Sequence, residues 1–438
     1  MLPKVSVGRY SSAMSTNMEN YRPLLGDDLV DELWELARDL RGARICHINS
    51  TGFGGGVAEL LSRYLPILQA LKINAEWRLI QARPEFFTAT KAMHNALQGA
   101  QYDLTQAQQN LYLQVNEESA KRLEVEYDVY FVHDPQPAAL RHFAGRRGAK
   151  WIWRCHIDTS SPHESTARFL SPYLQDYDAY VFTLAEFLLP SLGGKQSFFI
   201  PPAIDPLDTK NMELPLDICK RAVANVGVDL TRPLIVQVSR FDPWKDPEGV
   251  IATYRLVKQE IPAVQLALVG AIAGDDPEGW NLLERVHEES AKDPDVFVLT
   301  NLAGVGNMGV NVFQRAADVV IQKSLREGFG LVVSEALWKE RPVVAGKAGG
   351  IPMQFPSGYE SYLIQSIVEC AERVTHLLKH AGLRGEFGRA GREHVRRNFL
   401  LPRMIRDDLR VIRAVLRQTA PATKPLAAGT TATGSGLE

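Results

Sequence analysis

Two glutamates, Glu327 and Glu335, carry the strongest chemical signal in the chain, because the glycine turn Gly328-Phe329-Gly330 directly follows the first of them. The apolar run before this segment predicts a buried strand, and the run over 334–339 predicts a helix. Backbone N–H groups point outward at a helix start, and carboxylates accept hydrogen bonds from hydroxyl groups. The segment therefore predicts a site for an anion or a polyol. Two solvated glutamates on an ordinary turn fit the same spacing.

Arg240 and Lys245 form a second candidate site, in the segment SRFDPWK (239–245) that follows an apolar run over 233–238. An arginine guanidinium binds phosphate through two parallel hydrogen bonds, and a lysine ammonium contributes a point charge. Because the rest of the turn is apolar and a proline fixes it, we expect the two cations to bind a diphosphate. The alternative is a pair of surface cations without a ligand.

A glycine-rich segment, TGFGGG (51–56), follows the first predicted strand. Glycines let a backbone approach a ligand closely, and the next helix supplies N–H groups for a pyrophosphate. The dinucleotide-binding pattern G-x-G-x-x-G is not completed, because position 57 is valine. A tight turn without a ligand is therefore the alternative to a phosphate site.

Polar side chains also follow two further predicted strands: His133, Asp134 and Gln136 after one, and Arg154, His156 and Asp158 at the end of the other. Neutral histidine donates or accepts a hydrogen bond and aspartate accepts one, so these groups could orient sugar hydroxyls. Zinc is not expected, because the other ligands of a closed site are missing. A structural role is the alternative for His133 and His156, and it is the preferred interpretation of His47.

Short apolar runs separated by helical stretches must position these residues. In the N-terminal half we predict strands over 44–49, 75–80, 128–133, 150–156, 179–182 and 197–200, with a helical cap over 84–120. In the C-terminal half we predict strands over 233–238, 264–270, 296–299, 319–321 and 342–344. This pattern is typical of parallel sheets covered on both faces. The fold class is therefore α/β, with two doubly wound Rossmann-like βαβ domains, 1–205 and 206–399, facing across a cleft.

The composition agrees with an ordinary two-domain protein of 438 residues. A net charge of −2 gives no reason to expect nucleic acid or an anionic membrane as a partner. We predict a cytoplasmic location, since a signal-peptide core and a membrane-spanning run are both missing. The four scattered cysteines fit neither a metal site nor a disulfide framework. A helix near 400–418 is expected to pack back on the N-terminal domain, and 419–438 is expected to be a disordered tail.

Taken together, the motifs are similar to those of a known family. The spacing Glu327-x7-Glu335 with its glycine turn, the turn over 239–245 and the Gly-Gly turn at 55–56 resemble retaining GT-B glycosyltransferases of family 4. More narrowly, the trehalose glycosyltransferring synthases are resembled by longer strings: REGFGLVVSEALWK (326–339), VSRFDPWKDP (238–247), WRCHIDTSSP (153–162), HDPQPAAL (133–140) and HINSTGFGGGVAE (47–59). Their activity joins NDP-glucose to free glucose and gives α,α-trehalose and NDP. The resemblance makes 1–205 the acceptor side and 206–399 the nucleotide-sugar side.

The resemblance also implies a role for each matching residue. Arg240 and Lys245 would hold the diphosphate, Glu335 the ribose diol and Glu327 the donor glucose, while His156 would lie near the 6-hydroxyl of that glucose. The other donor-side residues would be Gly55, Gly56, Asn301, Leu302, Gly328, Phe329, Gly330 and Leu331. The acceptor-side residues would be Asp134, Gln136 and Arg154. The segment 353–362 departs from the acidic-glycine loop that is usual in the family.

Several alternatives stay open at this level. A trehalose phosphorylase would use glucose 1-phosphate on the same scaffold, and a nucleotide-sugar epimerase would convert the donor without an acceptor. A dinucleotide dehydrogenase is suggested only by the glycine turn. We expect no required cofactor, with Mg²⁺ at most stimulating through the nucleotide diphosphate. The sequence does not distinguish a monomer from a homodimer, and it does not select the base of the donor among ADP-, UDP- and GDP-glucose.

Overall fold

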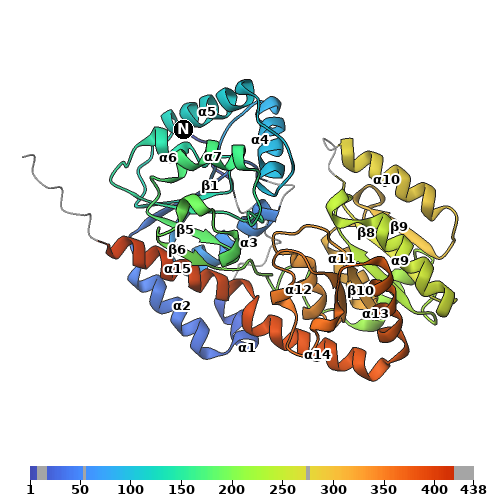
Figure 1. Cartoon of the computed structure of the whole chain (residues 1–438). Helices are drawn as coiled ribbons and strands as arrows, with labels where there is room; N and C mark the ends of the chain where they lie inside the picture. Colours follow the sequence, from blue (N-terminus) through green and yellow to red (C-terminus); the bar gives the residue numbers. More distant parts are fainter. Residues whose placement is uncertain (7–16, 53–55, 273–276, 419–438) are drawn as a thin grey trace, which may run out of the picture.

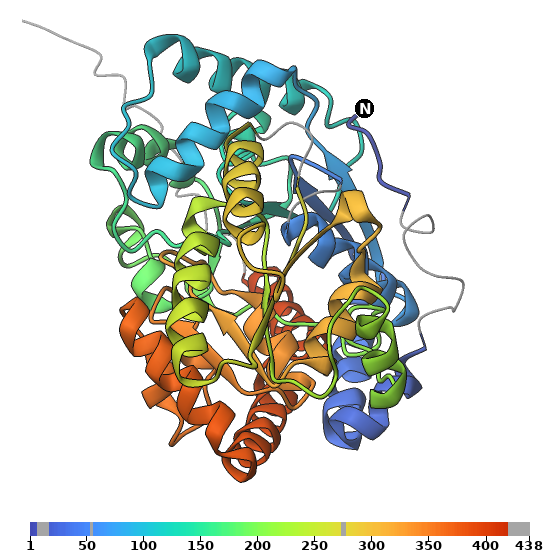
Figure 2. The same ribbon diagram turned by 90° about the vertical axis from the view of Figure 1, so that its right-hand side faces the viewer.

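The computed structural model of the chain describes residues 1–6, 17–52, 56–272 and 277–418, so the tail expected over 419–438 lies outside the described residues. Two lobes lie side by side, each built around one sheet with helices on both faces (Figure 1). The view turned by 90° shows the same layered arrangement with the C-terminal lobe towards the viewer (Figure 2). The prediction of two doubly wound α/β domains is confirmed.

The sheet of the N-terminal lobe has six parallel strands in the order β2-β1-β3-β4-β5-β6. The strands are β1 (Arg44–Asn49), β2 (Asn74–Leu79), β3 (Val129–His133), β4 (Lys150–Arg154), β5 (Ala179–Phe182) and β6 (Ser197–Phe199). Alternate residues face opposite layers. Phe131 packs into the core on one side of the sheet, and its neighbour Val132 packs into the core on the other. Burial on both faces is the reason for the continuous apolar runs in the sequence.

The sheet of the C-terminal lobe also has six parallel strands, in the order β12-β11-β10-β7-β8-β9. They are β7 (Leu234–Val238), β8 (Gln265–Gly270), β9 (Val296–Thr300), β10 (Val319–Gln322), β11 (Val343–Gly346) and β12 (Leu363–Ile364). The edge strand β12 was not predicted, because two residues are too few to form a recognisable apolar run.

Helices cover both sheets. Those of the first lobe are α1 (Arg22–Leu25), α2 (Asp27–Asp39), α3 (Gly56–Ala70), α4 (Pro84–Leu97), α5 (Gln106–Lys121), α6 (Leu140–Ala144) and α7 (Glu164–Leu174). The predicted cap corresponds to α4 and α5, which lie at the top of the molecule in both views (Figures 1 and 2). Helix α5 begins with a capping box, in which Thr105 and Gln108 each bond the other's backbone N–H.

A linker over residues 200–215 leads from β6 to the remaining helices, which are α8 (Leu216–Ala224), α9 (Pro247–Glu260), α10 (Pro277–Ser290), α11 (Asn307–Ala316), α12 (Leu331–Trp338), α13 (Ile367–Lys379), α14 (Ala381–Asn398) and α15 (Leu401–Arg417). Helix α15 lies along α2, on the N-terminal lobe (Figure 1). Leu409 and Ile412 of α15 are fully buried in the same core as Leu33 of α2. The last helix therefore contributes to the core of the first lobe.

Two segments of the chain pass between the lobes side by side. Ile204 pairs with the segment around Leu400, since its N–H donates to Phe399 O at 2.9 Å and its carbonyl accepts from Leu401 N at 2.8 Å. Ile204 and Leu400 belong to the core of the C-terminal lobe, whereas Ala203 and Leu401 belong to that of the N-terminal lobe. The lobes are thus joined by a double crossing rather than a single strand.

All four cysteines, Cys46, Cys155, Cys219 and Cys370, are buried free thiols. This agrees with the interpretation that their spacing forms no disulfide framework. In the part of the chain that the structure describes, no helix combines the length and the apolar character that a membrane span requires.

Candidate active site

A cavity of about 820 Å³ lies between the lobes, and residues of both lobes line it. Its lining includes the carboxyl ends of several strands: Asn49 ends β1, Asp134 follows β3, Arg240 follows β7, Asn301 follows β9 and Gln322 ends β10. Ligands bind at this edge in doubly wound folds. The cavity is also within the size range usual for small-molecule sites. We take it as the candidate active site.

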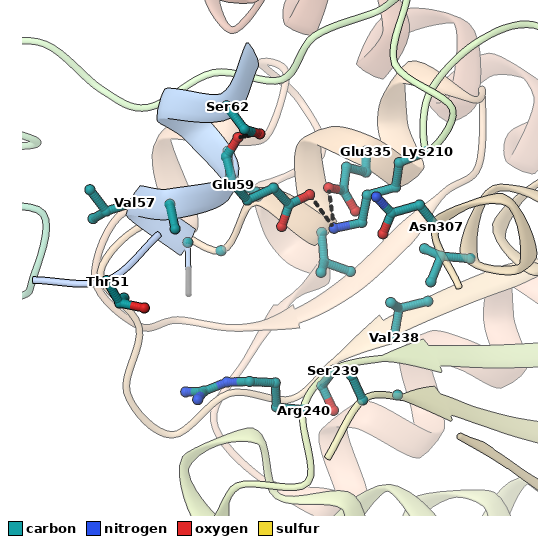
Figure 3. A pocket seen from close by; sticks show the side chains of 18 of the residues that line it. Thr51, Val57, Glu59, Ser62, Lys210, Val238, Ser239, Arg240, Asn307 and Glu335 are labelled. Carbon is teal, nitrogen blue, oxygen red and sulfur yellow. Dashed lines mark hydrogen bonds and ion pairs between the residues drawn. The ribbon is translucent and has the colours of Figure 1, made fainter. Parts of the chain in front are cut away.

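Hydrogen bonds hold the turn that carries Arg240 and Lys245. Gln237 Nε2 donates to Lys245 O at 2.8 Å, and Asp242 Oδ1 accepts from Trp244 N at 2.9 Å. Arg240 Nη2 lies 3.2 Å from Asp242 Oδ2, while its side chain remains 56% exposed. Both cations line the cavity, and Figure 3 shows the extended Arg240 side chain on the side opposite Lys210. The structure brings the two predicted cations to one site.

Glu327 is paired with Lys245. The lysine Nζ donates to Glu327 Oε2, and Ser324 Oγ donates to the same oxygen at 3.1 Å. Both partners of the pair line the cavity and are largely shielded from solvent. Two residues predicted for different parts of the donor therefore neutralise each other.

The backbone of the glycine turn is in close contact with the N-terminal lobe and with neighbouring segments of the C-terminal lobe. A Cβ at Gly328 would lie 2.7 Å from His156 O, and a Cβ at Gly349, which has φ +47°, would lie 1.6 Å from Glu327 O. Gln354 Nε2 donates to Phe329 O at 2.5 Å, and Gln354 Oε1 accepts from Ser334 N at 2.9 Å. Gln354 belongs to the segment that departs from the family pattern, and it fastens the start of α12.

Glu335 projects from α12 and is 3% exposed. Its Oε1 lies 3.2 Å from Lys210 Nζ, and the same ammonium lies 3.1 Å from Glu59 Oε1 of α3. Figure 3 shows both carboxylates pointing at the Lys210 ammonium, with a dashed line from it to each. Among the described residues Glu335 Oε2 has no hydrogen-bond partner. Lys210 and Glu59 were not predicted, because a single lysine in a linker and a glutamate within a helix leave no spacing signal.

Three histidines form a chain that ends at His156. His47 Nδ1 lies 3.0 Å from His133 Nε2, and His133 Nδ1 lies 3.0 Å from His156 Nε2, with stacked rings at each step. Burial lowers the pKa of His47 to about 3 and the pKa of both other rings well below its usual range, and the Arg154 cation adds to the effect. All three rings are neutral near pH 7. His47 is buried, in agreement with the structural role preferred for it.

Asp134 turns the chain sharply at the end of β3. It has φ +65°, a left-handed conformation that aspartate tolerates better than most residues. Its Oδ1 accepts from the backbone N–H of His156 at 2.8 Å. Burial raises the pKa of the Asp134 carboxyl to about 7. Asp134 and Gln136 both line the cavity, as expected for residues predicted on its acceptor side.

Arg154 is not part of the cavity. Its side chain is 3% exposed, and Nη1 lies 2.7 Å from each carboxylate oxygen of Asp408 on α15. Arg154 Nη2 donates to Ile200 O at 3.1 Å. The prediction of an acceptor contact is therefore wrong for this residue, which fastens β4 to the last helix. Its neighbour Trp153 points into the opposite layer of the sheet.

The remaining predicted residues divide into those inside and those outside the cavity lining. Gly56, Asn301, Gly330 and Leu331 line the cavity. Leu302 is 64% exposed and does not line the cavity. The ring of Phe329 packs on that of Phe399, with 5.4 Å between the ring centroids. His156 and Gly328 adjoin the lining at the contact between the lobes. Gly55 lies outside the described residues.

His94 of α4 is a lining residue that strand ends could not reveal, because it comes from the cap. Burial lowers its pKa to about 4, and the nearby Arg240 cation lowers it further. His94 is therefore neutral near pH 7, and it faces the side of the cavity where Arg240 stands. Within the described ranges, no group of three or more His, Cys, Asp or Glu side chains could hold a metal ion.

Comparison with known proteins agrees with this geometry. Residues 47–189 match the family described as "Trehalose synthase, N-terminal domain", and residues 220–394 match "Glycosyl transferases group 1". The chain is 50% identical to a trehalose synthase of Rubrobacter xylanophilus, covering 95% of this chain and 100% of that one. It is 44% identical to a trehalose synthase of Pyrococcus horikoshii, covering 92% and 98%.

More distant proteins share the scaffold. A trehalose phosphorylase of Pleurotus pulmonarius is 28% identical over 79% of this chain, which spans 54% of that protein. The solved structure of a sucrose-phosphate synthase from Thermosynechococcus elongatus superimposes with a TM-score of 0.68 at 18% identity, covering 85% of this chain and 99% of that one. Such a likeness shows the fold alone, which is that of the GT-B glycosyltransferases. With the two close relatives, it establishes that the chain belongs to the trehalose synthase family of GT-B glycosyltransferases.

Proposed function

We propose that the protein transfers a glucosyl group from an NDP-glucose to free glucose with retention, and so makes α,α-trehalose and NDP. One observation carries the proposal: a single cavity joins a pair of cations, two carboxylates and a set of neutral polar groups across two lobes. The cations suit a diphosphate, and the carboxylates suit hydroxyl groups on either side of it. A nucleotide sugar has this order of groups.

The donor would lie along the C-terminal lobe. Arg240 and Lys245 would bind the diphosphate, and Glu335 would accept from the ribose diol through its free Oε2. Glu327 would exchange part of its pairing with Lys245 for hydroxyl groups of the donor glucose. His156 uses Nε2 in the histidine chain, which leaves Nδ1 as the ring nitrogen for the sugar.

In the proposed reaction the bond between the anomeric carbon and the diphosphate oxygen breaks first, and its electron pair leaves with the NDP. An oxocarbenium-like state follows, and the acceptor hydroxyl attacks the face from which the NDP departs. The acceptor proton passes to the departing phosphate oxygen. Arg240 and Lys245 would contribute most, because they neutralise the charge that develops on the leaving group.

We assign no carboxylate as a covalent nucleophile. Retaining hydrolases place two carboxyl groups across the bond that breaks. Here Glu327 is held by Lys245 and Ser324, and Asp134 is held by the His156 N–H and has a pKa of about 7. Asp134, Gln136 and His94 would instead orient the acceptor glucose on the N-terminal lobe.

Phosphorolysis is the second candidate, since a trehalose phosphorylase shares the scaffold. A buried carboxylate with a free oxygen favours the nucleotide sugar, because glucose 1-phosphate carries no ribose for Glu335 to bind. The test offers the enzyme glucose with ADP-, UDP- or GDP-glucose, or with glucose 1-phosphate, and identifies the product by NMR. Trehalose from an NDP-glucose supports the proposal. Trehalose only from glucose 1-phosphate, or donor conversion without glucose, would overturn it.

A further inference from the structure

Lys210 connects three parts of the molecule at one point of the cavity wall. It belongs to the linker that follows the crossing at Ile204, while Glu59 comes from α3 of one lobe and Glu335 from α12 of the other. The ammonium lies 3.1 Å from Glu59 Oε1 and 3.2 Å from Glu335 Oε1 (Figure 3). Only 15% of the Lys210 side chain is exposed. A lysine has three donors, so it can serve both carboxylates at once.

Within the described part of the chain, one carboxylate oxygen of Glu335 is paired and the other is not. Oε1 lies beside Lys210, whereas Oε2 is buried and has no partner among the described residues. The backbone that carries Glu335 is also fixed, because buried Lys339 donates to Glu335 O at 3.0 Å and to Gln314 Oε1 at 2.8 Å. The carboxylate is therefore immobilised with Oε2 free.

The positive charge of Lys210 has an effect of its own, in addition to the hydrogen bonds that the ammonium donates. A carboxylate next to a diphosphate site repels the phosphates, and a buried carboxylate without a cation tends to take up a proton. Burial lowers the pKa of the Lys210 ammonium, but the carboxylates of Glu335 and Glu59 outweigh that effect and raise it. Lys210 therefore stays charged throughout the neutral range.

We infer that Lys210 is a positioning residue for the donor: by holding Oε1 it fixes the Glu335 carboxylate so that Oε2 is left to accept from the ribose diol of the nucleotide. This inference rests on the proposed function and deepens it. Glu59 shares the same ammonium from the acceptor lobe, so the ribose contact is tied to both lobes. Lys210 need not touch the substrate to act in this way.

The test is a thermodynamic cycle between Lys210 and the ribose. Calorimetry measures the Kd of the tightest-binding of ADP, UDP and GDP, and the Kd of its 2′,3′-dideoxy counterpart. In the unmodified protein the dideoxy compound should bind about 10- to 100-fold more weakly, the loss expected for hydrogen bonds to a charged group. In Lys210→Met and Lys210→Gln this ratio should fall towards one, and Lys210→Arg should restore part of it.

Lys258→Met is the matched control. Lys258 is also paired with two carboxylates, Asp293 at 2.7 Å and Asp295 at 2.9 Å, but it does not line the cavity. Its variant should keep the unmodified ratio. Lys210→Gln retains a polar side chain, so it carries the test if Lys210→Met does not fold.

The outcomes separate this inference from the proposed function. If the protein makes trehalose from an NDP-glucose but Lys210→Gln keeps the full ratio, Lys210 does not position Glu335 and the inference alone is overturned. If the unmodified protein binds no NDP and makes no trehalose from any NDP-glucose, both are overturned.

Discussion

Replacement of Arg240 by alanine should slow glucosyl transfer by about 10²–10³-fold, the loss seen when one preorganised donor to a developing charge is removed. This corresponds to about 2.7–4 kcal/mol of transition-state stabilisation. The cost in stability should be small, because the Arg240 side chain is 56% exposed and its partner Asp242 lies in the same turn. Exposed pairs of this kind contribute about 0–1 kcal/mol. A large kinetic effect with almost no change in stability is therefore expected.

The assay follows trehalose formation from the preferred NDP-glucose under saturating glucose, with thermal unfolding measured on the same samples. Arg285→Ala is the control, because Arg285 is similarly exposed at 51% and pairs with Glu248 in the same lobe but away from the cavity. It should change neither quantity. Arg240→Lys keeps the charge without the two-pronged geometry, so its rate should be intermediate. An Arg240→Ala enzyme with unchanged kcat would remove Arg240 from the mechanism.

Three further predictions concern stability and metal dependence. Asp408→Asn should lower the free energy of unfolding in urea by about 3–5 kcal/mol, because it leaves the buried Arg154 guanidinium of β4 unpaired; Asp39→Asn, which loosens an exposed pair between α2 and α15, should cost at most about 1 kcal/mol. Since burial raises the pKa of Asp134 to about 7, the folded state holds its proton where the unfolded state has released it, and stability should fall as pH rises from about 4 to about 7. Asp134→Asn should show a smaller fall in Tm over this range, and an equal fall would contradict the assignment. Excess EDTA should leave most of the transfer rate, because Arg240 and Lys245 supply the positive charge; a loss restored by Mg²⁺ would refute this.

The alternation of apolar runs and helices predicted both sheets, and the strand-end rule located Arg240, Lys245, Glu327 and Glu335 at one cavity. The rule failed at Arg154. A strand end fixes how far along the sheet a side chain lies, but not which face it takes. Arg154 is two residues after Ile152, so both side chains face the layer that holds α15, and Trp153 faces the other. The sequence shows that side chains alternate along the strand. Assigning each alternate set to a face requires knowing which helices cover that face.

Lys210 and His94 show a second limit. Both line the cavity, yet one comes from a linker and the other from the last turn of a cap helix. Neither position has a periodic or turn signal, because what brings these residues to the site is the packing of one lobe against the other. Contacts of this kind depend on pairs of residues far apart in the chain, such as Glu59 and Glu335, and local patterns carry no information about them.

The charges of the cavity form paired sets that the proposed nucleotide-sugar donor would rearrange. Lys245 is neutralised by Glu327, and Lys210 is shared by Glu59 and Glu335, so neither cation stands unpaired in the low-dielectric wall. A diphosphate would draw Lys245 towards itself and release Glu327 to accept from the donor glucose, while Lys210 keeps Glu335 fixed for the ribose. Glu59 contacts Lys210 from the N-terminal lobe, and His156 of that lobe lies against the glycine turn after Glu327. The rearrangement would therefore change contacts with both lobes. Binding of the donor and closure of the acceptor lobe against it would then depend on the same set of ion pairs. This would explain why the site is divided between two domains.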